Sequence, residues 1–542
     1  MAQQYKLKDL TNLDLEELGK VEAQVEGIEG GKVLLVKVRG QVHALNANCT
    51  HYGAPLKNGV VTSDGRITCP WHGACFSANT GDVEDAPAPN ALNKFDVVEK
   101  DGSVYVRGKE ADIKAAKRVV GVKVVPKNQQ RLVIVGSGSG AFGVLLKLRE
   151  LGYQDQTTVL TNESLPIDRT KLSKALITDA SKLYLQPQAW YDDGAINIES
   201  ETVTSVDFKA KAVKTQSGKV FPYTKLILAS GGTPKRLPLP GFKDLENIFV
   251  IRRVSDVQAI VAAVGNKGKN IVIIGTSFIG MEAANALAKD NNVTLVGMED
   301  APLERVMGKQ VGQIFQRSLE KNGAKFYLGA SVDSAVPASE GGRNVGAVKL
   351  KDGTELKADL VILGVGVSPA TEYLRRNPDV TLERDGSLSV DESFAVKGLP
   401  DVYAIGDIAT YPYSGPGGNN SPVRIEHWNV AQNAGRSVGQ QIAQPSSSKA
   451  PESFIPIFWS ALGSQLRYAG ATPNGYDDLV IKGDPANGKF VAYYTKGDDV
   501  VAVASMMMDP ILVQSAELMR KGQMLTKSEI EAGKDPLKST SL

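Results

Sequence analysis

The stretch Cys49-Thr-His51, with its counterpart Cys69-Pro-Trp-His72, decides the fold of the N-terminal part of the chain. Each stretch supplies one thiol and one imidazole from a short segment. The chain has three cysteines and four histidines, so most of its thiols and half of its imidazoles lie in this pattern. This concentration predicts a metal centre with Cys49, His51, Cys69 and His72 as its ligands.

Two kinds of centre accept two sulfurs and two nitrogens. Zinc fingers place both cysteines in one pair and both histidines in the other. In a Rieske 2Fe-2S cluster, two thiolates hold one iron and two imidazoles hold the other, with one ligand of each kind from each loop. The pattern here favours the Rieske cluster, and zinc is the alternative. The third cysteine, Cys75, is expected to be a small buried residue.

Length and composition are those of a multidomain globular protein. At 542 residues, with 42% hydrophobic and 23% charged residues, the chain predicts three or four domains. A net charge of +2 gives no argument for nucleic acid or membrane surfaces as partners. No apolar run approaches the ~20 residues of a membrane span. Acidic residues near the start argue against a signal peptide, so we expect a cytoplasmic protein, with an organelle as the alternative.

Residues 1–109 are expected to form a β-rich domain around the two ligand loops. Short β-branched or alternating runs at 32–38, 41–45 and 103–107 are bounded by glycine and predict strands. Residues 110–130 are charged and lack a long apolar run, which predicts a linker.

A dinucleotide-binding unit is predicted after this linker. The apolar run 131–135 is typical of a buried parallel strand, and Gly136-Ser-Gly138-Ser-Gly140-Ala141 follows it directly. Gly136 permits a tight turn, Gly138 lets a pyrophosphate approach the helix N-terminus, and Ala141 permits close helix packing. Glu163, after a second strand, is the candidate for the ribose hydroxyls.

The same pattern returns later in the chain, which predicts a second dinucleotide. A strand at 270–274 leads into Gly275-Thr-Ser277-Phe-Ile-Gly280, and the next strand ends near Glu299. Ser277 stands where the second glycine is usual. Carboxylates at 299 and 300 would repel a 2′-phosphate, so we expect NADH rather than NADPH, although Gly297 occupies the usual position of the acid.

Several further motifs together resemble one known family. They are Cys69-Pro-Trp-His-Gly-Ala-Cys-Phe76, Leu165-Pro-Ile-Asp-Arg169-Thr-Lys-Leu-Ser-Lys174, Leu226-Ile-Leu-Ala-Ser-Gly-Gly-Thr-Pro234, Val402-Tyr-Ala-Ile-Gly-Asp407, Glu426-His-Trp428 and Phe458-Trp-Ser460. Over almost its whole length the chain resembles the Rieske-bearing, apoptosis-inducing-factor-like oxidoreductases, whose flavoprotein part is similar to oxygenase-coupled ferredoxin reductases.

This resemblance implies a multidomain fold: a β-rich Rieske domain, two Rossmann-like α/β flavoprotein domains and a C-terminal α+β domain. The expected boundaries are 1–109 for the Rieske domain, 110–130 for the linker, 131–253 and 376–445 for the FAD-binding domain, 254–375 for the NAD-binding domain and 454–542 for the C-terminal domain. Residues 446–453 are polar and predict another linker.

The resemblance also implies roles for individual residues. The residues expected to hold FAD are Gly136, Gly138, Ala141, Glu163, Arg169, Lys174 and Asp407, with the backbone of Val203 near the adenine. Trp428 and Trp459 resemble aromatics near the flavin edge, although either could be plain core. Lys174 and Glu282 are expected to form an ion pair beside the hydride-accepting nitrogen of the flavin, where an ammonium stabilises the reduced ring. Gly275, Ser277, Gly280 and Glu299 are the candidates for NADH.

Missing residues narrow the chemistry further. High-potential Rieske proteins of respiratory complexes carry a disulfide and hydroxyl donors beside the cluster, whereas this chain has Ala54, Trp71, Ala74 and Phe76 at the matching positions. We therefore expect a potential near the low end of the Rieske range, roughly −150 mV. No cysteine follows Cys75, which excludes thiol chemistry at the flavin.

The predicted function is electron transfer from NADH through FAD to the 2Fe-2S cluster and on to an unidentified acceptor. That acceptor could be a dedicated partner such as an oxygenase or a haem protein. A redox-sensing or death-signalling role with slow turnover is the alternative, and a homodimer is possible. A nitrite-reductase-like assembly would need sirohaem-binding cysteines that the chain lacks.

Overall fold

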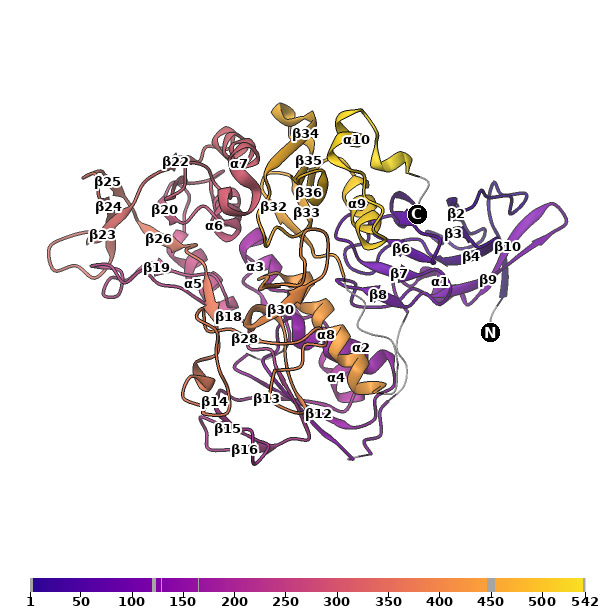
Figure 1. Cartoon of the computed structure of the whole chain (residues 1–542), viewed down its shortest axis with the longest axis horizontal. Coiled ribbons are helices and arrows are strands. Elements are labelled where there is room, and N and C mark those ends of the chain that lie inside the picture. The colour runs from indigo at the N-terminus through magenta and orange to yellow at the C-terminus, as the bar shows by residue number, and fades with distance from the viewer. Residues whose placement is uncertain (1–2, 119–122, 128, 164, 446–453, 540–541) are drawn as a thin grey trace.

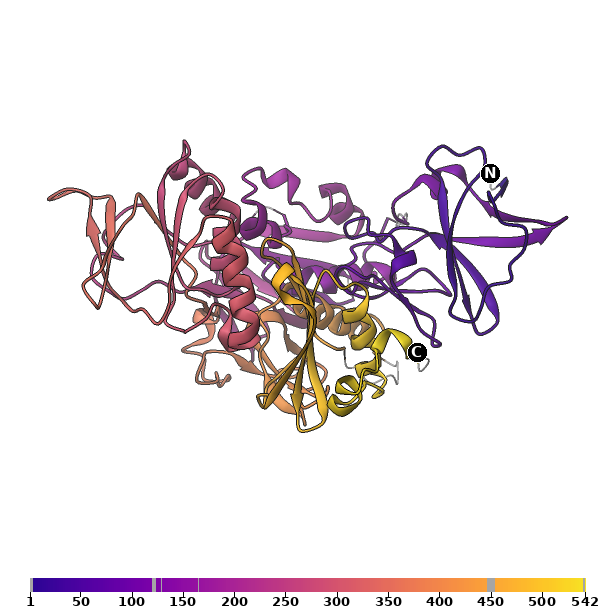
Figure 2. The ribbon, with the colours of Figure 1, turned by 90° about the horizontal axis from the view of Figure 1, so that it is seen from above.

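The computed structural model describes residues 3–118, 123–127, 129–163, 165–445, 454–539 and 542. Figure 1 shows the N-terminal β domain at one end of the long axis and the second dinucleotide unit at the other. The first dinucleotide unit and the C-terminal domain lie between them, and the view from above in Figure 2 keeps this order. The predicted multidomain architecture is confirmed.

The N-terminal domain contains a six-stranded and a four-stranded antiparallel sheet, ordered β1-β10-β9-β4-β3-β2 and β5-β6-β7-β8. The larger sheet consists of β1 (Gln3–Lys6), β2 (Lys20–Gln24), β3 (Lys32–Val38), β4 (Gln41–Asn46), β9 (Lys94–Lys100) and β10 (Ser103–Gly108). The smaller sheet consists of β5 (Val60–Val61), β6 (Arg66–Thr68), β7 (Cys75–Ser77) and β8 (Val83–Asp85). Strand β3 is buried on both faces: Leu34 packs beside the ligand cysteines, and Leu35 packs in a separate core. The ligand loops follow β4 and β6.

The predicted linker 110–130 begins as ordered structure, which corrects its first residues. Helix α1 (Glu110–Lys114) continues the N-terminal domain, and Ile113 is buried in that domain's core. Asn46 donates a hydrogen bond to the Asp112 carbonyl (3.1 Å) and fixes the helix on the sheet. The helix was not predicted, because a single apolar residue, Ile113, gives no helical periodicity.

The first dinucleotide unit is a parallel sheet ordered β13-β12-β11-β17-β29. Its elements include β11 (Arg131–Val135), α2 (Ser139–Glu150), β12 (Gln156–Thr161), α3 (Thr170–Ala175), α4 (Gln188–Asp193), β13 (Ile196–Ser200), β17 (Lys225–Leu228), β29 (Val402–Ala404) and α8 (Trp428–Ala443). Four of the five residues of β11 are buried, as its continuous apolar run predicts for a central parallel strand. A meander, β14 (Val203–Asp207), β15 (Ala212–Thr215) and β16 (Val220–Pro222), lies beside this sheet.

The second unit repeats the first, with the parallel order β22-β21-β20-β26-β19 and its own meander β23-β24-β25. Its elements are β19 (Ile248–Phe249), α5 (Val254–Val264), β20 (Asn270–Ile274), α6 (Phe278–Leu287), β21 (Asn292–Val296), α7 (Glu304–Lys321), β22 (Lys325–Tyr327), β23 (Val332–Pro337), β24 (Val345–Leu350), β25 (Glu355–Lys357) and β26 (Leu360–Leu363). Because β19 pairs with β26, the unit starts before the predicted boundary at 254. Strands β18 (Gly232–Pro234) and β27 (Val367–Pro369) pair at the crossings between the two units.

The C-terminal domain is a five-stranded antiparallel sheet, ordered β32-β33-β36-β35-β34, with two α-helices. Its elements are β32 (Ile457–Ala461), β33 (Gln465–Gly470), β34 (Asp478–Asp484), β35 (Lys489–Lys496), β36 (Asp499–Met506), α9 (Ile511–Arg520) and α10 (Lys527–Glu531). The predicted linker 446–453 lies outside the described residues. Within the described ranges, no helix is both long and apolar enough to cross a membrane.

Helices α2 and α8 pack so closely that their interface requires glycine. A Cβ added to Gly143 would lie 2.1 Å from the carbonyl oxygen of Gln432, and one added to Gly435 would lie 2.0 Å from that of Gly140. Both helices start at the predicted FAD site, so this contact fixes the position of the dinucleotide loop.

We expect Gly143→Ala to destabilise the protein, because the added methyl group forces α2 and α8 apart. Overpacking of this kind costs about 1–3 kcal/mol in the free energy of unfolding. Chemical denaturation followed by circular dichroism measures this change. Ser437→Ala, on a half-buried position of α8, is the control and should shift stability by less than about 0.5 kcal/mol. Equal losses in both variants would contradict the prediction.

Candidate functional site

The two predicted ligand loops share one backbone geometry. In each loop, the cysteine N–H donates to the carbonyl five residues later, at 2.8 Å for both Cys49 and Cys69. The glycine four residues later donates back to the cysteine carbonyl, at 2.9 Å for Gly53 and 3.2 Å for Gly73. These glycines have φ of 76° and 74°, a conformation that disfavours side chains. The loops are therefore two copies of one turn.

The four predicted ligands come together as a thiol pair and an imidazole pair. His51 Nδ1 lies 3.1 Å from His72 Nδ1. Two nitrogens each about 2.1 Å from one tetrahedral metal ion would be about 3.4 Å apart, so the two imidazoles fit a shared iron. Cys49 and Cys69 are buried, with their sulfurs in hydrogen-bond contact. Burial lowers the pKa of His51 to about 4 and also lowers that of His72, so both rings are neutral, the form that binds metal.

The arrangement argues against zinc. A zinc ion would need its protein ligands around one point. Here the two imidazoles contact each other and the two thiols contact each other. A Rieske cluster asks for two ligands at each of two irons, which is the division seen here.

Backbone groups supply hydrogen bonds to the ligand sulfurs. The N–H groups two and three residues after Cys49 donate to its sulfur, and those after Cys69 do the same. Ala54, Trp71, Ala74 and Phe76 stand where the disulfide and the hydroxyl donors of high-potential Rieske proteins are missing. The low potential expected from these residues stays a prediction.

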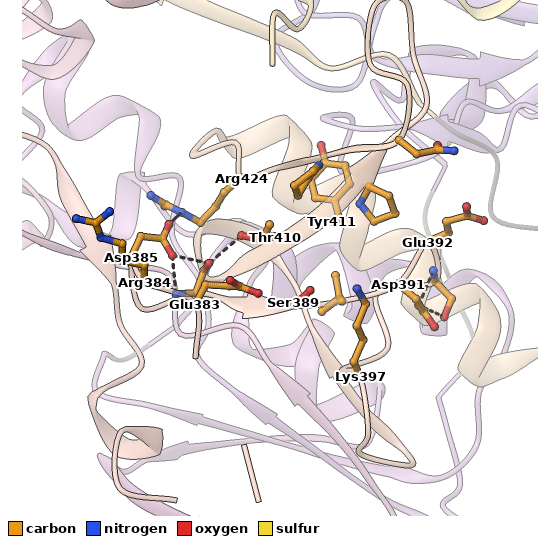
Figure 3. Close-up of a pocket in the computed structure, with 16 residues that line it drawn as sticks. Glu383, Arg384, Asp385, Ser389, Asp391, Glu392, Lys397, Thr410, Tyr411 and Arg424 are labelled. Atoms are coloured by element: carbon orange, nitrogen blue, oxygen red, sulfur yellow. Dashed lines mark hydrogen bonds and ion pairs between the residues drawn. The ribbon is translucent and has the colours of Figure 1, made fainter. Parts of the chain in front are cut away.

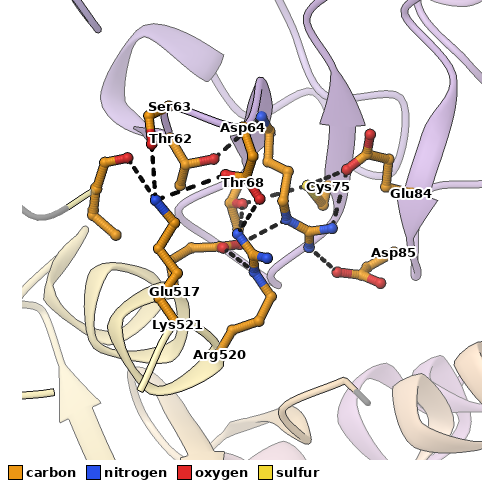
Figure 4. Close-up of polar contacts among 12 residues, drawn as sticks. Thr62, Ser63, Asp64, Thr68, Cys75, Glu84, Asp85, Glu517, Arg520 and Lys521 are labelled. Carbon is orange, nitrogen blue, oxygen red and sulfur yellow. Dashed lines mark hydrogen bonds and ion pairs between the residues drawn. The ribbon is translucent and has the colours of Figure 1, made fainter. Parts of the chain in front are cut away.

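Cys75 is buried, as predicted, in a polar network between the N-terminal and C-terminal domains (Figure 4). Its sulfur accepts a hydrogen bond from Thr68 Oγ1 (3.5 Å) and lies 3.9 Å from Glu84 Oε2. Arg66 joins Glu84 to Glu517 of α9. Burial raises the pKa of the Cys75 thiol, so it stays protonated and unreactive.

The first glycine loop has the shape that a pyrophosphate requires. Gly136 has φ of 100°, and a Cβ there would lie 2.3 Å from the Ala229 carbonyl oxygen. A Cβ on Gly138, at the start of α2, would meet nothing within 4 Å, which leaves the N-terminus of that helix open to a phosphate. Ala141 is buried in the core of the unit. The three residues fit the FAD cradle expected from the sequence.

The other FAD candidates belong to one chain of polar contacts. Arg169 Nη2 lies 2.8 Å from Glu163 Oε2, and Arg169 Nη1 donates to the Arg252 carbonyl (2.8 Å). Arg252 Nη2 in turn lies 3.3 Å from Asp407 Oδ2. These contacts connect Glu163, which is expected to bind the ribose of FAD, with Asp407, which is expected to bind its ribityl chain. Sequence reasoning missed Arg252, because no motif includes it.

Lys174 and Glu282 form the predicted ion pair, with Lys174 Nζ 3.0 Å from Glu282 Oε1. Glu282 is 4% exposed and also accepts hydrogen bonds from Ser460 Oγ (2.6 Å) and Ser173 Oγ (2.5 Å). These contacts fix the carboxylate of Glu282, which in turn holds the Lys174 ammonium in place. The two serines were not singled out as site residues, although each lies within a motif quoted above.

The second glycine loop has the same tight turn as the first. Gly275 has φ of 103°, and a Cβ on Gly280 would lie 2.1 Å from the Gly275 carbonyl oxygen. The Ser277 hydroxyl donates a hydrogen bond to the Gly364 carbonyl (3.1 Å), so this side chain has its partner inside the protein. The departure from glycine at Ser277 is therefore compatible with the loop's expected role.

At the end of β21, the position where an acidic residue is usual is occupied by Gly297, and the reason is packing. A Cβ on Gly297 would lie 2.6 Å from Thr276 Oγ1, so an acid cannot stand at the strand end. Glu299, two residues later, has its carboxylate 2.8 Å from Arg305 Nε. The side chain of Arg305 is 76% exposed, so this pair lies at the surface.

The two tryptophans differ in position. Trp428 begins α8 and its carbonyl accepts a hydrogen bond from Ser139 Oγ (2.5 Å). The ring of Trp459, on β32, lies 4.5 Å from His72, 5.6 Å from His51 and 5.2 Å from His427, measured between ring centroids. Trp459 therefore connects the ligand loops to the flavoprotein part.

Val203 begins β14, and it packs against the core of the first unit. A cavity of 970 Å³ lies elsewhere on this unit (Figure 3). Arg424 in its wall donates to the Asp407 carbonyl (3.1 Å) and pairs with Asp385. The cavity's acidic and basic side chains are mixed, and among the described residues that line it there is no predicted site residue.

Three family models match consecutive parts of the chain. They are described as Rieske [2Fe-2S] domain at residues 8–96, pyridine nucleotide-disulphide oxidoreductase at 130–435 and reductase C-terminal at 457–541. The first match decides between a Rieske cluster and zinc. With the others, it makes FAD, the 2Fe-2S cluster and NAD(P)H the groups that the site serves.

Individual relatives agree with these matches. Apoptosis-inducing factor 3 of Homo sapiens is 38% identical over 97% of this chain and 85% of its own length. The ferredoxin reductase subunit of 5,5'-dehydrodivanillate O-demethylase from Sphingobium is 31% identical over 75% of this chain and 97% of its own length. The crystal structure of the covalent putidaredoxin reductase-putidaredoxin complex matches with a TM-score of 0.67 and 27% identity, covering 73% of this chain and 94% of its own.

We expect Cys69→Ser to abolish cluster binding, because a hydroxyl does not replace a thiolate ligand of iron. Cys75→Ser should retain the cluster, because that thiol lies within the polar network described above. Iron content and the electron paramagnetic resonance spectrum of the reduced protein measure the difference. Loss of the cluster in Cys75→Ser alone would show that the ligand set is wrong.

Proposed function

Because the chain belongs to the pyridine nucleotide-disulphide oxidoreductase family, we propose that it passes electrons from NADH through FAD to its Rieske cluster and on to a separate acceptor. It is an FAD-dependent NAD(P)H oxidoreductase with a Rieske domain before the flavoprotein part and a reductase C-terminal domain after it. When bound, FAD accepts a hydride and releases electrons singly, and the 2Fe-2S cluster takes one electron at a time.

The observation that carries this proposal is the contact of Trp459 with both histidine ligands. His72 and His51 face the C-terminal domain, and Trp459 fills the space between them and His427, the N-cap residue of α8. Burial lowers the pKa of His427 to about 3, and the Lys174 ammonium contributes to the same shift. Ser460, the residue after Trp459, donates to Glu282, the ion-pair partner of Lys174. The proposed flavin-side lysine and the proposed cluster ligands are thus linked through neighbouring residues of β32.

Lys174 would favour the reduced flavin. Its ammonium stabilises negative charge on a reduced ring, and Glu282 keeps it oriented. Because both partners are buried or half-buried, their charges are screened less by solvent than those of a surface pair. Gly136, Gly138, Ala141, Glu163, Arg169, Asp407, Val203 and Trp428 are proposed to hold FAD as the sequence implied.

A cluster within the same chain would act as a resident acceptor at high effective concentration. The final acceptor is proposed to be a one-electron carrier, such as an oxygenase component or a haem protein. The signalling role, the homodimer and the cytoplasmic location stay untested predictions.

The proposal is tested by anaerobic titration of the holoprotein with NADH. Flavin absorbance should bleach, and a reduced Rieske spectrum should then appear by electron paramagnetic resonance without any added carrier. Flavin reduction with a cluster that stays oxidised would contradict electron transfer within the chain. Slow turnover with every tested acceptor would favour the signalling alternative.

We expect Trp459→Leu to slow reduction of the cluster at least tenfold, because it removes the ring between the histidine ligands and His427. Flavin reduction by NADH should change less than twofold. Stopped-flow absorbance separates the two steps. Trp190→Leu, in α4 of the first unit, is the control and should leave both rates unchanged. Equal slowing of both steps in Trp459→Leu would indicate a general disturbance instead.

We expect Glu299→Ser to shift preference toward NADPH, because it removes a carboxylate that would repel the 2′-phosphate and frees Arg305 to bind it. The ratio of kcat/KM for NADPH to that for NADH should rise at least tenfold. The double variant Glu299→Ser/Arg305→Ser should lose most of this gain. An unchanged ratio in Glu299→Ser would remove Glu299 from the proposed NADH site.

A further inference from the structure

Tyr52 connects a cluster ligand to the flavin-binding segment. Its ring stacks on the imidazole of His51, with centroids 3.8 Å apart and an interplanar angle of 17°. Its hydroxyl donates a hydrogen bond of 2.5 Å to Asp168 Oδ2. Asp168 directly precedes Arg169 and the helix that contains Lys174. The Asp168 carboxylate, the Tyr52 ring and the His51 imidazole therefore lie next to one another in this order.

The carboxylate of Asp168 lies in a protected position. The residue is 6% exposed, and its other oxygen accepts hydrogen bonds from Thr170 N (3.1 Å) and Thr170 Oγ1 (2.5 Å). Lys171 Nζ lies 3.5 Å from Oδ2 and 5.1 Å from the centre of the Tyr52 ring. Tyr52, Thr170 and Lys171 thus hold the Asp168 carboxylate in one position, and burial limits the screening of its charge by solvent.

We propose that Asp168, acting through Tyr52, sets the reduction potential of the Rieske cluster. Reduction adds one electron to the cluster, and a nearby fixed negative charge opposes that addition. The Tyr52 hydroxyl reduces this opposition, because it donates a hydrogen bond to the carboxylate and spreads its charge. The carboxylate lowers the potential and the hydroxyl raises it. Both are positioning residues, and the inference rests on the proposed function, in which His51 and His72 would hold one iron of the cluster.

Two variants at the ends of this hydrogen bond should move the potential in opposite directions. Asp168→Asn removes the negative charge and should make reduction of the cluster more favourable. Tyr52→Phe keeps the charge and the ring stacking but removes the donor, so it should make reduction less favourable. Each change should be at least threefold in the equilibrium constant for reduction, where tenfold corresponds to about 59 mV for one electron.

The measurement is a redox titration of the full-length holoprotein with chemical mediators, followed by electron paramagnetic resonance. Asp179→Asn removes an exposed carboxylate from the same part of the first unit and is the charge-matched control, with no shift expected. A purely structural hydrogen bond would give the same direction of change, or none, in both variants, and either result would overturn the proposal. If Asp168→Asn fails to retain the cluster, Tyr52→Phe alone decides, because an unchanged or raised potential contradicts the inference.

This titration does not depend on NADH, FAD or Trp459. Failure of electron transfer from NADH to the cluster would overturn the proposed function but leave the titration interpretable. Opposite shifts in the two variants would support the role of Asp168 whatever the route by which electrons reach the cluster.

Discussion

The packing of the cluster loops on strand β32 is the contact on which the rest of this structure depends. Gly73, in the second loop, lies so close to Ile457 that a Cβ there would meet the isoleucine Cδ1 at 2.6 Å. Arg467 of the neighbouring strand is 3% exposed, pairs with Asp509 and donates to the Trp71 carbonyl. The histidine side of the cluster site is thereby fixed toward the flavoprotein part.

Buried charge maintains this arrangement. Glu282 with Lys174, Arg467 with Asp509 and Arg66 with Glu517 are each largely removed from water. Such pairs add little net stability, but a buried charge that loses its partner is costly. Displacement of the N-terminal domain would break the contacts of Arg66 and Arg467 across the interface. These pairs therefore favour one relative placement of the domains over nearby alternatives.

The two dinucleotide units show how one pattern is adapted to two tasks. Four strands have the same order in both units, and the glycines after β11 and β20 have the same conformation. The fifth strand differs, because β29 comes last in the chain and β19 comes first. The first unit contributes Lys174 and the loops near the cluster, whereas the second contributes Glu282 from the middle of α6. One residue from each unit thus builds the buried ion pair of Lys174 and Glu282.

The sequence by itself predicted Cys49, His51, Cys69 and His72 as ligands and determined the glycine loops and the strands around them, because these depend on residue type and spacing within short segments. Helix α1 was not predicted, and the second unit starts before the expected boundary, since both features depend on pairing and burial by distant residues. Only the tertiary structure decided that Trp459 rather than Trp428 contacts the histidine ligands, and that Tyr52 donates to Asp168. Tyr52 and Asp168 are 116 positions apart in the chain. Local periodicity cannot predict which distant side chains a loop will contact.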